Sequence, residues 1–139
     1  MHQAQRAFVI QTHGQGLYEF TDEVERWVGE EAMNQGLLTL FCRHTSASLV
    51  IQENADPDVV HDLLAFFARI APEDDRLYRH TIEGPDDMPG HIKAVLTQTS
   101  LTIPITQHRT TLGTWQGIYL FEHRSHAHRR HVTGHLIGE

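Results

Sequence analysis

Hydrophobic positions in this chain fall into short runs and alternations, separated by polar turns that contain Gly, Pro, Asn or Asp. Short runs rich in aliphatic and aromatic residues predict β-strands. The predicted strands are residues 7–10, 17–20, 38–42, 49–51, 100–106, 115–121 and 130–137. Gly14-Gln15-Gly16 separates the first two strands, so we expect them to form a hairpin. The strand 38–42 is an uninterrupted apolar run, which is typical of a strand covered on both faces.

Three further segments carry apolar residues at the three- and four-residue spacing of an amphipathic helix. The first, residues 22–32, begins at Thr21 and Asp22, which are both suitable N-cap residues. The second, residues 56–70, opens with an Asp-Pro pair that favours a helix start, and its broad apolar stripe predicts the main core helix. The third is shorter and covers residues 88–96.

This order of elements predicts the fold class. No strand-helix-strand unit repeats along the chain, so the class is α+β. With 139 residues, of which 40% are hydrophobic, the chain suits one domain over residues 1–139 that buries about two thirds of its unfolded surface. We expect a compact mixed β-sheet or sandwich with about three helices.

Composition narrows the environment and the partners. The chain has 11 Lys and Arg against 18 Asp and Glu, a formal charge of -7, which argues against nucleic-acid and anionic-membrane surfaces. No apolar segment approaches the roughly 20 residues of a membrane span. The single cysteine, Cys42, lies in an apolar run and is expected to be a buried, inert thiol. We therefore expect a cytoplasmic protein that binds neither membranes nor nucleic acid.

Histidine is abundant, with 12 in the chain, and three histidines stand where sites are commonly built. His44 follows the strand 38–42, His80 lies in the polar segment 73–90, and His91 lies in the third predicted helix. Three neutral imidazoles can hold a divalent ion such as zinc and leave a fourth position open. The acidic residues near the latter two are Glu83, Asp86 and Asp87.

A phosphate site is a second interpretation of the segment after this strand. Its candidate residues are Arg43, Thr45, Ser46 and Ser48, with Lys93 or Arg124 adding positive charge. A hydroxyl-rich strand and turn without a ligand explains the same residues equally well. The histidines after residue 122 are interspersed with arginines, which disfavour a cation, so we interpret them as an exposed turn and the polar face of the last strand. Nucleophile-elbow, Walker and dinucleotide motifs are absent.

Three motifs carry a resemblance to a known family. HTSASLVIQENADPDV (His44–Val59), DDMPGHIK (Asp86–Lys93) and GTWQGIYLFEHR (Gly113–Arg124) resemble the YjbQ-like family, which is named for secondary thiamine-phosphate synthase activity. The resemblance covers essentially the whole chain. It implies a compact α+β subunit that assembles as a homotrimer, with pockets near the subunit contacts. It also implies a metal or substrate site at His44, His80 and His91, with Thr45, Ser46 and Asp87 as neighbours.

The activity implied by this resemblance joins a pyrimidine pyrophosphate to a thiazole phosphate and releases pyrophosphate. A divalent metal, with zinc favoured and magnesium possible, and cationic side chains suit such chemistry. Asp87, Glu83 and Lys93 are the catalytic candidates, and Arg43 and Arg124 are the candidate phosphate-binding cations. One alternative is a metal-dependent hydrolase in which Glu83 or Asp87 is the base. Another is a non-catalytic trimer that binds a metal or an anionic metabolite.

Overall fold

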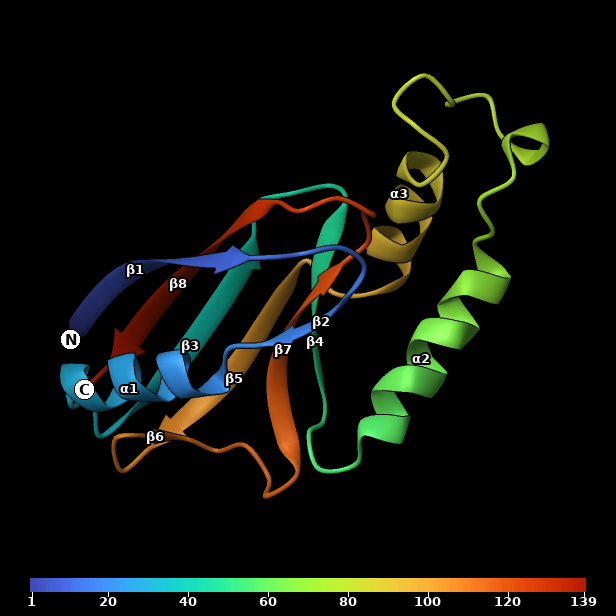
Figure 1. Ribbon diagram of the computed structural model, residues 1–139. Helices are drawn as coiled ribbons and strands as arrows, with labels where there is room; N and C mark the ends of the chain where they lie inside the picture. Colours follow the sequence, from blue (N-terminus) through green and yellow to red (C-terminus); the bar gives the residue numbers. More distant parts are fainter.

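The computed structural model describes residues 1–139 and contains two β-sheets and three α-helices (Figure 1). The strands are β1 (His2–Gln11), β2 (Gly16–Glu19), β3 (Gln35–Cys42), β4 (Ala47–Glu53), β5 (Ser100–Thr106), β6 (Arg109–Thr110), β7 (Gln116–Glu122) and β8 (Arg129–Gly138). The helices are α1 (Thr21–Glu31), α2 (Pro57–Ile70), the short 3-10 helix η1 (Asp75–Leu77) and α3 (Asp87–Leu96). The α+β prediction is confirmed.

Every strand pair in the two sheets is antiparallel. The larger sheet has the order β1-β8-β3-β5-β6, and the smaller has the order β2-β7-β4. The expectation of a mixed sheet is therefore wrong. The predicted hairpin of the first two strands is also wrong, because β1 pairs with β8 whereas β2 pairs with β7 of the other sheet. The chain does turn between β1 and β2, but the two strands pair with strands from the other end of the chain.

One apolar core lies between the sheets and α1. It joins Val24 and Trp27 of α1 to Leu38 and Leu40 of β3 and to Leu120 of β7, and all five are at most 3% exposed. The longer strands contribute every second residue, because alternate side chains of a strand point to opposite faces. The hydrophobic effect over this shared interior holds the two sheets together.

Strand β3 is central in the larger sheet, but only one of its faces is covered. Leu38 and Leu40 are fully buried, whereas Leu37 is 46% and Phe41 49% exposed on the opposite face. The prediction of a strand buried on both sides is thus wrong for the single chain. The run is apolar because Leu37 and Phe41 make the outer face of β3 hydrophobic, although no other element of the same chain covers that face.

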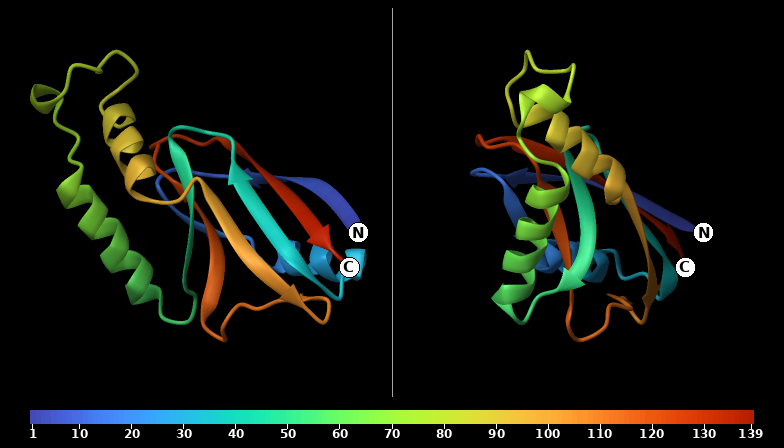
Figure 2. Two further views of the ribbon diagram at one scale, coloured as in Figure 1. Left: turned by 180° about the vertical axis from the view of Figure 1, so that it is seen from behind. Right: turned by 90° about the vertical axis from the view of Figure 1, so that its right-hand side faces the viewer.

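Helix α2 is the second element that differs from expectation. Asp56 caps it as predicted, since its side chain accepts a hydrogen bond from the amide of Asp58 at 2.9 Å. No residue of α2 is buried, however, and Figures 1 and 2 show the helix standing beside the sheets, next to α3. Phe67 contacts Phe121 of β7 with ring centroids 5.3 Å apart, and a pocket of 350 Å³ lined by Leu63 and Phe67 lies between α2 and the outer face of the smaller sheet. The apolar stripe of α2 therefore does not make it the main core helix.

No helix combines the length and the apolar character needed to cross a membrane.

A buried polar network joins the ends of the two sheets. Glu122, the last residue of β7, is fully buried and its carboxylate accepts hydrogen bonds from the guanidinium of Arg130 in β8. The same carboxylate accepts from the hydroxyl of Thr12 at 2.7 Å and from the amide of Arg124 at 3.1 Å. Burial raises the pKa of Glu122, but the hydrogen bonds from Arg130 and Thr12 outweigh it and hold the pKa below its ordinary value.

His123, the next residue, is also fully buried. Its Nε2 lies 2.9 Å from the hydroxyl oxygen of Ser48, which also accepts a hydrogen bond from Thr97 at 2.5 Å. Nδ1 of His123 has no hydrogen-bond partner. Burial, together with the nearby positive charge of Lys93, lowers the pKa of His123 to about 3. The ring therefore stays neutral in the folded protein.

This burial makes the stability of the fold depend on pH. The ordinary pKa of 6.5 applies to His123 in the unfolded chain, so below that pH the unfolded state takes up a proton that the folded state refuses until about pH 3. The contribution of the neutral His123 ring to the free energy of unfolding is complete above pH 6.5 and is lost as the pH falls toward 3. In His123→Phe, the free energy of unfolding should fall less steeply over this range, by up to about 1.4 kcal/mol per pH unit. Urea denaturation at several pH values measures both slopes, and equal slopes would contradict the prediction.

Candidate functional site

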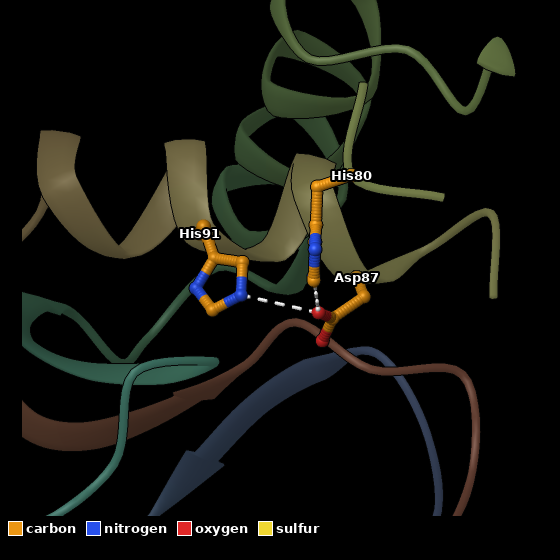
Figure 3. Close-up of side chains that lie close together, drawn as sticks. All are labelled: His80, Asp87 and His91. Atoms are coloured by element: carbon orange, nitrogen blue, oxygen red, sulfur yellow. Dashed lines mark hydrogen bonds and ion pairs between the residues drawn. The ribbon is translucent and has the colours of Figure 1, made fainter. Parts of the chain in front are cut away.

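Three potential metal ligands meet where α3 faces the loop before it. Asp87 and His91 are four residues apart on α3 and therefore share one face of the helix. The segment between η1 and α3 turns back and brings His80 to the same face (Figure 3). The ligand atoms of the three residues all lie within 4.8 Å of one another. We call this group the His80–Asp87–His91 cluster.

Both imidazoles point at one oxygen of the carboxylate. Nε2 of His80 lies 2.6 Å and Nε2 of His91 3.1 Å from Oδ2 of Asp87 (Figure 3). The other carboxylate oxygen, Oδ1, accepts a hydrogen bond from Nη1 of Arg124 at 2.7 Å. Burial raises the pKa of Asp87, but the hydrogen bond with His80 and the charge of Arg124 outweigh it, so the pKa is lowered and Asp87 is an anion at neutral pH.

The hydrogen-bond partners of His91 agree with a metal site at the cluster. Nδ1 of His91 lies 3.1 Å from the backbone oxygen of Thr45, which can only accept, so Nδ1 carries a proton. In the neutral ring, Nε2 then presents a lone pair to Oδ2 of Asp87, and two electron-rich atoms face each other stably only across a proton or a cation. A carbonyl on the second ring nitrogen is also the arrangement that commonly orients metal-binding histidines. The residues present thus fit a divalent ion.

Arg124 and Asp86 support the cluster from behind. Asp86 accepts from Nε of Arg124 at 2.9 Å and from the amide of Ser125 at 2.8 Å, while Nη2 of Arg124 donates to the backbone oxygen of Glu83 at 2.8 Å. Asp86 is the N-cap residue of α3, but its side chain makes no capping hydrogen bond. Because the guanidinium of Arg124 is engaged by Asp86, Asp87 and Glu83, it holds the cluster in place.

A pocket of 840 Å³ opens beside the cluster, and His91 belongs to both. Its wall contains two arginines, two histidines and three hydroxyl residues, but no Asp or Glu. We call it the basic pocket; it is lined by Phe41, Cys42, Arg43, His44, Thr45, Ser46, His91, Ala94, Val95, Thr99 and Arg130. In a chain with a formal charge of -7, a large pocket without acidic residues favours an anionic ligand.

His44 lies in the basic pocket but outside the His80–Asp87–His91 cluster. Its Nε2 accepts a hydrogen bond from the backbone amide of His131 at 2.8 Å, and the two rings stack with centroids 6.0 Å apart. Burial, followed by the positive charge of Arg130, lowers the pKa of His44. The sequence predicted His44, His80 and His91 as the metal ligands, whereas the structure brings Asp87, and not His44, together with His80 and His91.

The other predicted site residues divide into three groups. Arg43, Thr45 and Ser46 line the basic pocket as the phosphate interpretation requires. Ser48 does not, because it is buried against His123 and Thr97. Glu83 is exposed beside the cluster, 3.5 Å from Nε2 of His80.

Lys93 is 5% exposed and lies on the inner side of α3, outside the pocket lining. Burial lowers its pKa, while the charges of Glu73 and Asp86 act in the opposite direction. Cys42 is buried as predicted, and burial raises the pKa of its thiol. Lys93 and Cys42 are therefore both almost completely buried, although Cys42 lines the basic pocket.

Arg130 is the site residue that sequence reasoning missed. It was grouped with the basic run near the C-terminus, although it shares strand parity with Val132, Gly134 and Leu136, which are all buried. A charged residue on the inward side of an alternating strand is the signal that could have singled it out. Among the histidines after residue 122, His126 and His131 are exposed as predicted, whereas the prediction is wrong for His123, which is fully buried. His128 contacts the backbone of His126, and His135 contacts Gln3.

Comparison with known proteins agrees with this architecture. The profile described as UPF0047 protein YjbQ-like matches residues 6–139. A UPF0047 protein of Synechocystis is 53% identical over 137 residues, covering 99% of this chain and 93% of the relative. The UPF0047 protein YjbQ of Escherichia coli O157:H7 is 43% identical, covering 97% of this chain and 98% of the relative.

A crystal structure of a yjbq/upf0047 family protein from Clostridium acetobutylicum superposes with a TM-score of 0.86 at 35% identity, covering 95% of this chain and 99% of the other. A protein from Sulfolobus solfataricus has the same TM-score, 0.86, at 23% identity and shows likeness of fold alone. The predicted resemblance is thus confirmed over nearly the full length. This chain belongs to the YjbQ-like, or UPF0047, family.

Proposed function

We propose that this protein is a metal-dependent enzyme that acts on a phosphorylated small molecule. The reaction favoured by its resemblance is that of a thiamine-phosphate synthase-type transferase, which joins a pyrimidine pyrophosphate to a thiazole phosphate and releases pyrophosphate. The observation that carries the proposal is the meeting of His80, Asp87 and His91 beside a pocket whose wall has two arginines and no carboxylate.

The donor set of the cluster favours zinc. Two imidazoles and one carboxylate suit zinc and similar divalent ions, whereas magnesium is mostly held by oxygen ligands. Magnesium is the second choice for this reason. An ion bound by His80, Asp87 and His91 would supply positive charge beside the phosphate groups that are transferred or released.

The chain's own groups bind and orient the substrate in this proposal. Thr45 and Ser46 bring hydroxyl groups to the pocket wall, and the exposed guanidinium of Arg43 adds charge at the same wall. Asp87 orients both imidazoles, and Arg124 orients Asp87. Asp87 is therefore assigned a ligand and positioning role instead of that of a free general base.

One observation favours a second candidate, a metal-dependent hydrolase. The carboxylate of Glu83 is 60% exposed and lies 3.5 Å from Nε2 of His80, so it stands beside the cluster with access to water. A carboxylate in that place can serve as a general base for hydrolysis of a phosphoester. Glu83→Gln removes this base without removing a ligand of the cluster.

The metal site gives a prediction that does not need a known substrate. His80→Ala, His91→Ala and Asp87→Asn should each lower the zinc bound per chain, because each removes one of three ligands. His44→Ala should retain the zinc, since its Nε2 is occupied by the amide of His131. Elemental analysis after dialysis measures the ratio. Loss of zinc in His44→Ala with full retention in the other variants would overturn the assignment of ligands.

The reaction is tested with the two thiamine precursors and a panel of phosphoesters. Chelation should lower turnover by about 100-fold or more, because an ion at the leaving group accounts for several kcal/mol of barrier lowering. Turnover of the precursors supports the transferase. Turnover of phosphoesters alone, sensitive to Glu83→Gln, supports the hydrolase. Saturable metal and ligand binding without any turnover would leave a non-catalytic binding protein and overturn the proposal of an enzyme.

We also propose that the chain assembles as a homotrimer, as its resemblance implies. The open face of the larger sheet supports association, because Leu37 and Ile137 are paired across β3 and β8 and are 46% and 36% exposed. Phe41 extends the same face at 49% exposure. An apolar surface of this kind is typical of a protein interface. Trp115, just before β7, is 62% exposed and offers a different apolar surface.

Light scattering tests both the assembly and the surface that forms it. The wild-type mass should be near three times 15.9 kDa. Phe41→Asp should shift the mass toward that of the single chain, because a charge would be buried against apolar side chains. Trp115→Asp is the matched control and should leave the mass unchanged. A wild-type mass of 15.9 kDa would exclude the trimer, and dissociation by the control alone would place the interface elsewhere.

A further inference from the structure

The guanidinium of Arg130 is fixed at the wall of the basic pocket. Arg130 is the second residue of β8 and is 4% exposed. Nε donates to Oε1 of Glu122 at 2.8 Å, and Nη2 donates to Glu122 and to the hydroxyl of Ser46 at 3.0 Å. Because two of its nitrogens are held by the protein, the side chain has little rotational freedom to lose when a ligand binds.

The third nitrogen of this guanidinium is free. Nη1 makes no hydrogen bond with any protein group, although Arg130 is almost completely buried. The only fully enclosed side-chain nitrogen or oxygen without a partner is Nδ1 of His123, so Nη1 is not sealed in the interior. Arg130 lines the basic pocket, and that pocket is the space its unpaired donor reaches.

The surroundings of Nη1 are matched to an anion. Ser46, whose oxygen contacts Arg130, also lines the pocket, and the exposed Arg43 lies on the same wall. Glu122 faces Arg130 from inside the protein and does not line the pocket. Phe41 and Val95 give the wall an apolar part. A pocket of 840 Å³ accommodates a small molecule with an apolar body and one anionic end.

We propose that Arg130 is the fixed anchor for the phosphate end of the ligand, with Ser46 beside it and Glu122 as its positioning residue. The free Nη1 of the guanidinium and the hydroxyl of Ser46 match the oxygens of a phosphate group. Arg124, the cation expected from the sequence for this task, is engaged by Asp86 and Asp87 instead. This inference deepens the proposed function by naming the group that selects phosphorylated ligands, and it rests on that function for the class of ligand.

Binding of pyrophosphate to the metal-free protein tests the anchor separately from the metal and from turnover. Calorimetry in the presence of a chelator should show saturable binding to the wild type. Arg130→Lys keeps the positive charge but loses the planar guanidinium, which binds Glu122 and presents Nη1 to the pocket at the same time, and should weaken binding by about 10-fold or more. Arg129→Lys is the matched control, since Arg129 is exposed on the opposite side of the same strand, and it should bind like the wild type.

A second variant separates binding from folding. If Arg130→Lys loses its thermal transition, Glu122→Gln/Arg130→Gln removes both charges of the pair, so no charge is left buried without a partner. This folded variant should also lose pyrophosphate binding, and normal binding by it or by Arg130→Lys would overturn the anchor. Absence of binding to the metal-free wild type, or equal competition by acetate, would overturn it too. Metal-dependent turnover with an unaffected Arg130→Lys would leave the proposed function standing without this anchor.

Discussion

The buried ion pair between Glu122 and Arg130 is the interaction on which both halves of the site depend. Glu122 ends β7 in the smaller sheet, and Arg130 lies at the start of β8 in the larger one, so the pair fixes the two sheets at one end. The chain between them carries Arg124, whose amide also donates to Glu122 and whose guanidinium holds Asp87. Breaking such a pair by removing one partner leaves a buried charge and is strongly destabilising. The cluster and the basic pocket are thus positioned by one short segment.

The carboxylates near the basic pocket form ion pairs with arginines and do not line the pocket. Asp86 and Asp87 are paired with Arg124, and Glu122 is paired with Arg130. In each pair the carboxylate accepts hydrogen bonds from an arginine of the same chain, and the pKa of each of the three acids is lowered. The wall of the pocket is left without a carboxylate, although the chain as a whole is acidic. Local geometry, and not net charge, therefore sets the ligand preference of the site.

Two apolar surfaces, the outer face of β3 and the stripe of α2, were predicted to be core because of their sequence pattern. The outward side chains of β3 and the stripe of α2 are as hydrophobic as core elements, yet Leu37 and Phe41 of β3 are exposed and no residue of α2 is fully buried within one chain. Periodicity records which side chains avoid water, but it does not say which surface covers them. This is why the sequence predicted β3 as covered on both faces and α2 as the main core helix, and why an association between copies is a physically reasonable use of these faces.

The sequence by itself determined the α+β class, the positions of most strands and helices, the Asp56 cap and the burial of Cys42, because these follow from alternation, helical spacing and capping chemistry close in the chain. It also named Asp87 as a neighbour of His80 and His91, but it placed Asp87 before the third helix, whereas the structure has Asp87 as the first residue of α3, on the same face as His91. Only the tertiary structure decided the strand partners, the return of His80 to α3 and the exclusion of His44 from the cluster. It also revealed the role of Arg130, whose partners Glu122 and Ser46 belong to other strands and loops. Such contacts join residues far apart in sequence, and no local spacing encodes their distance.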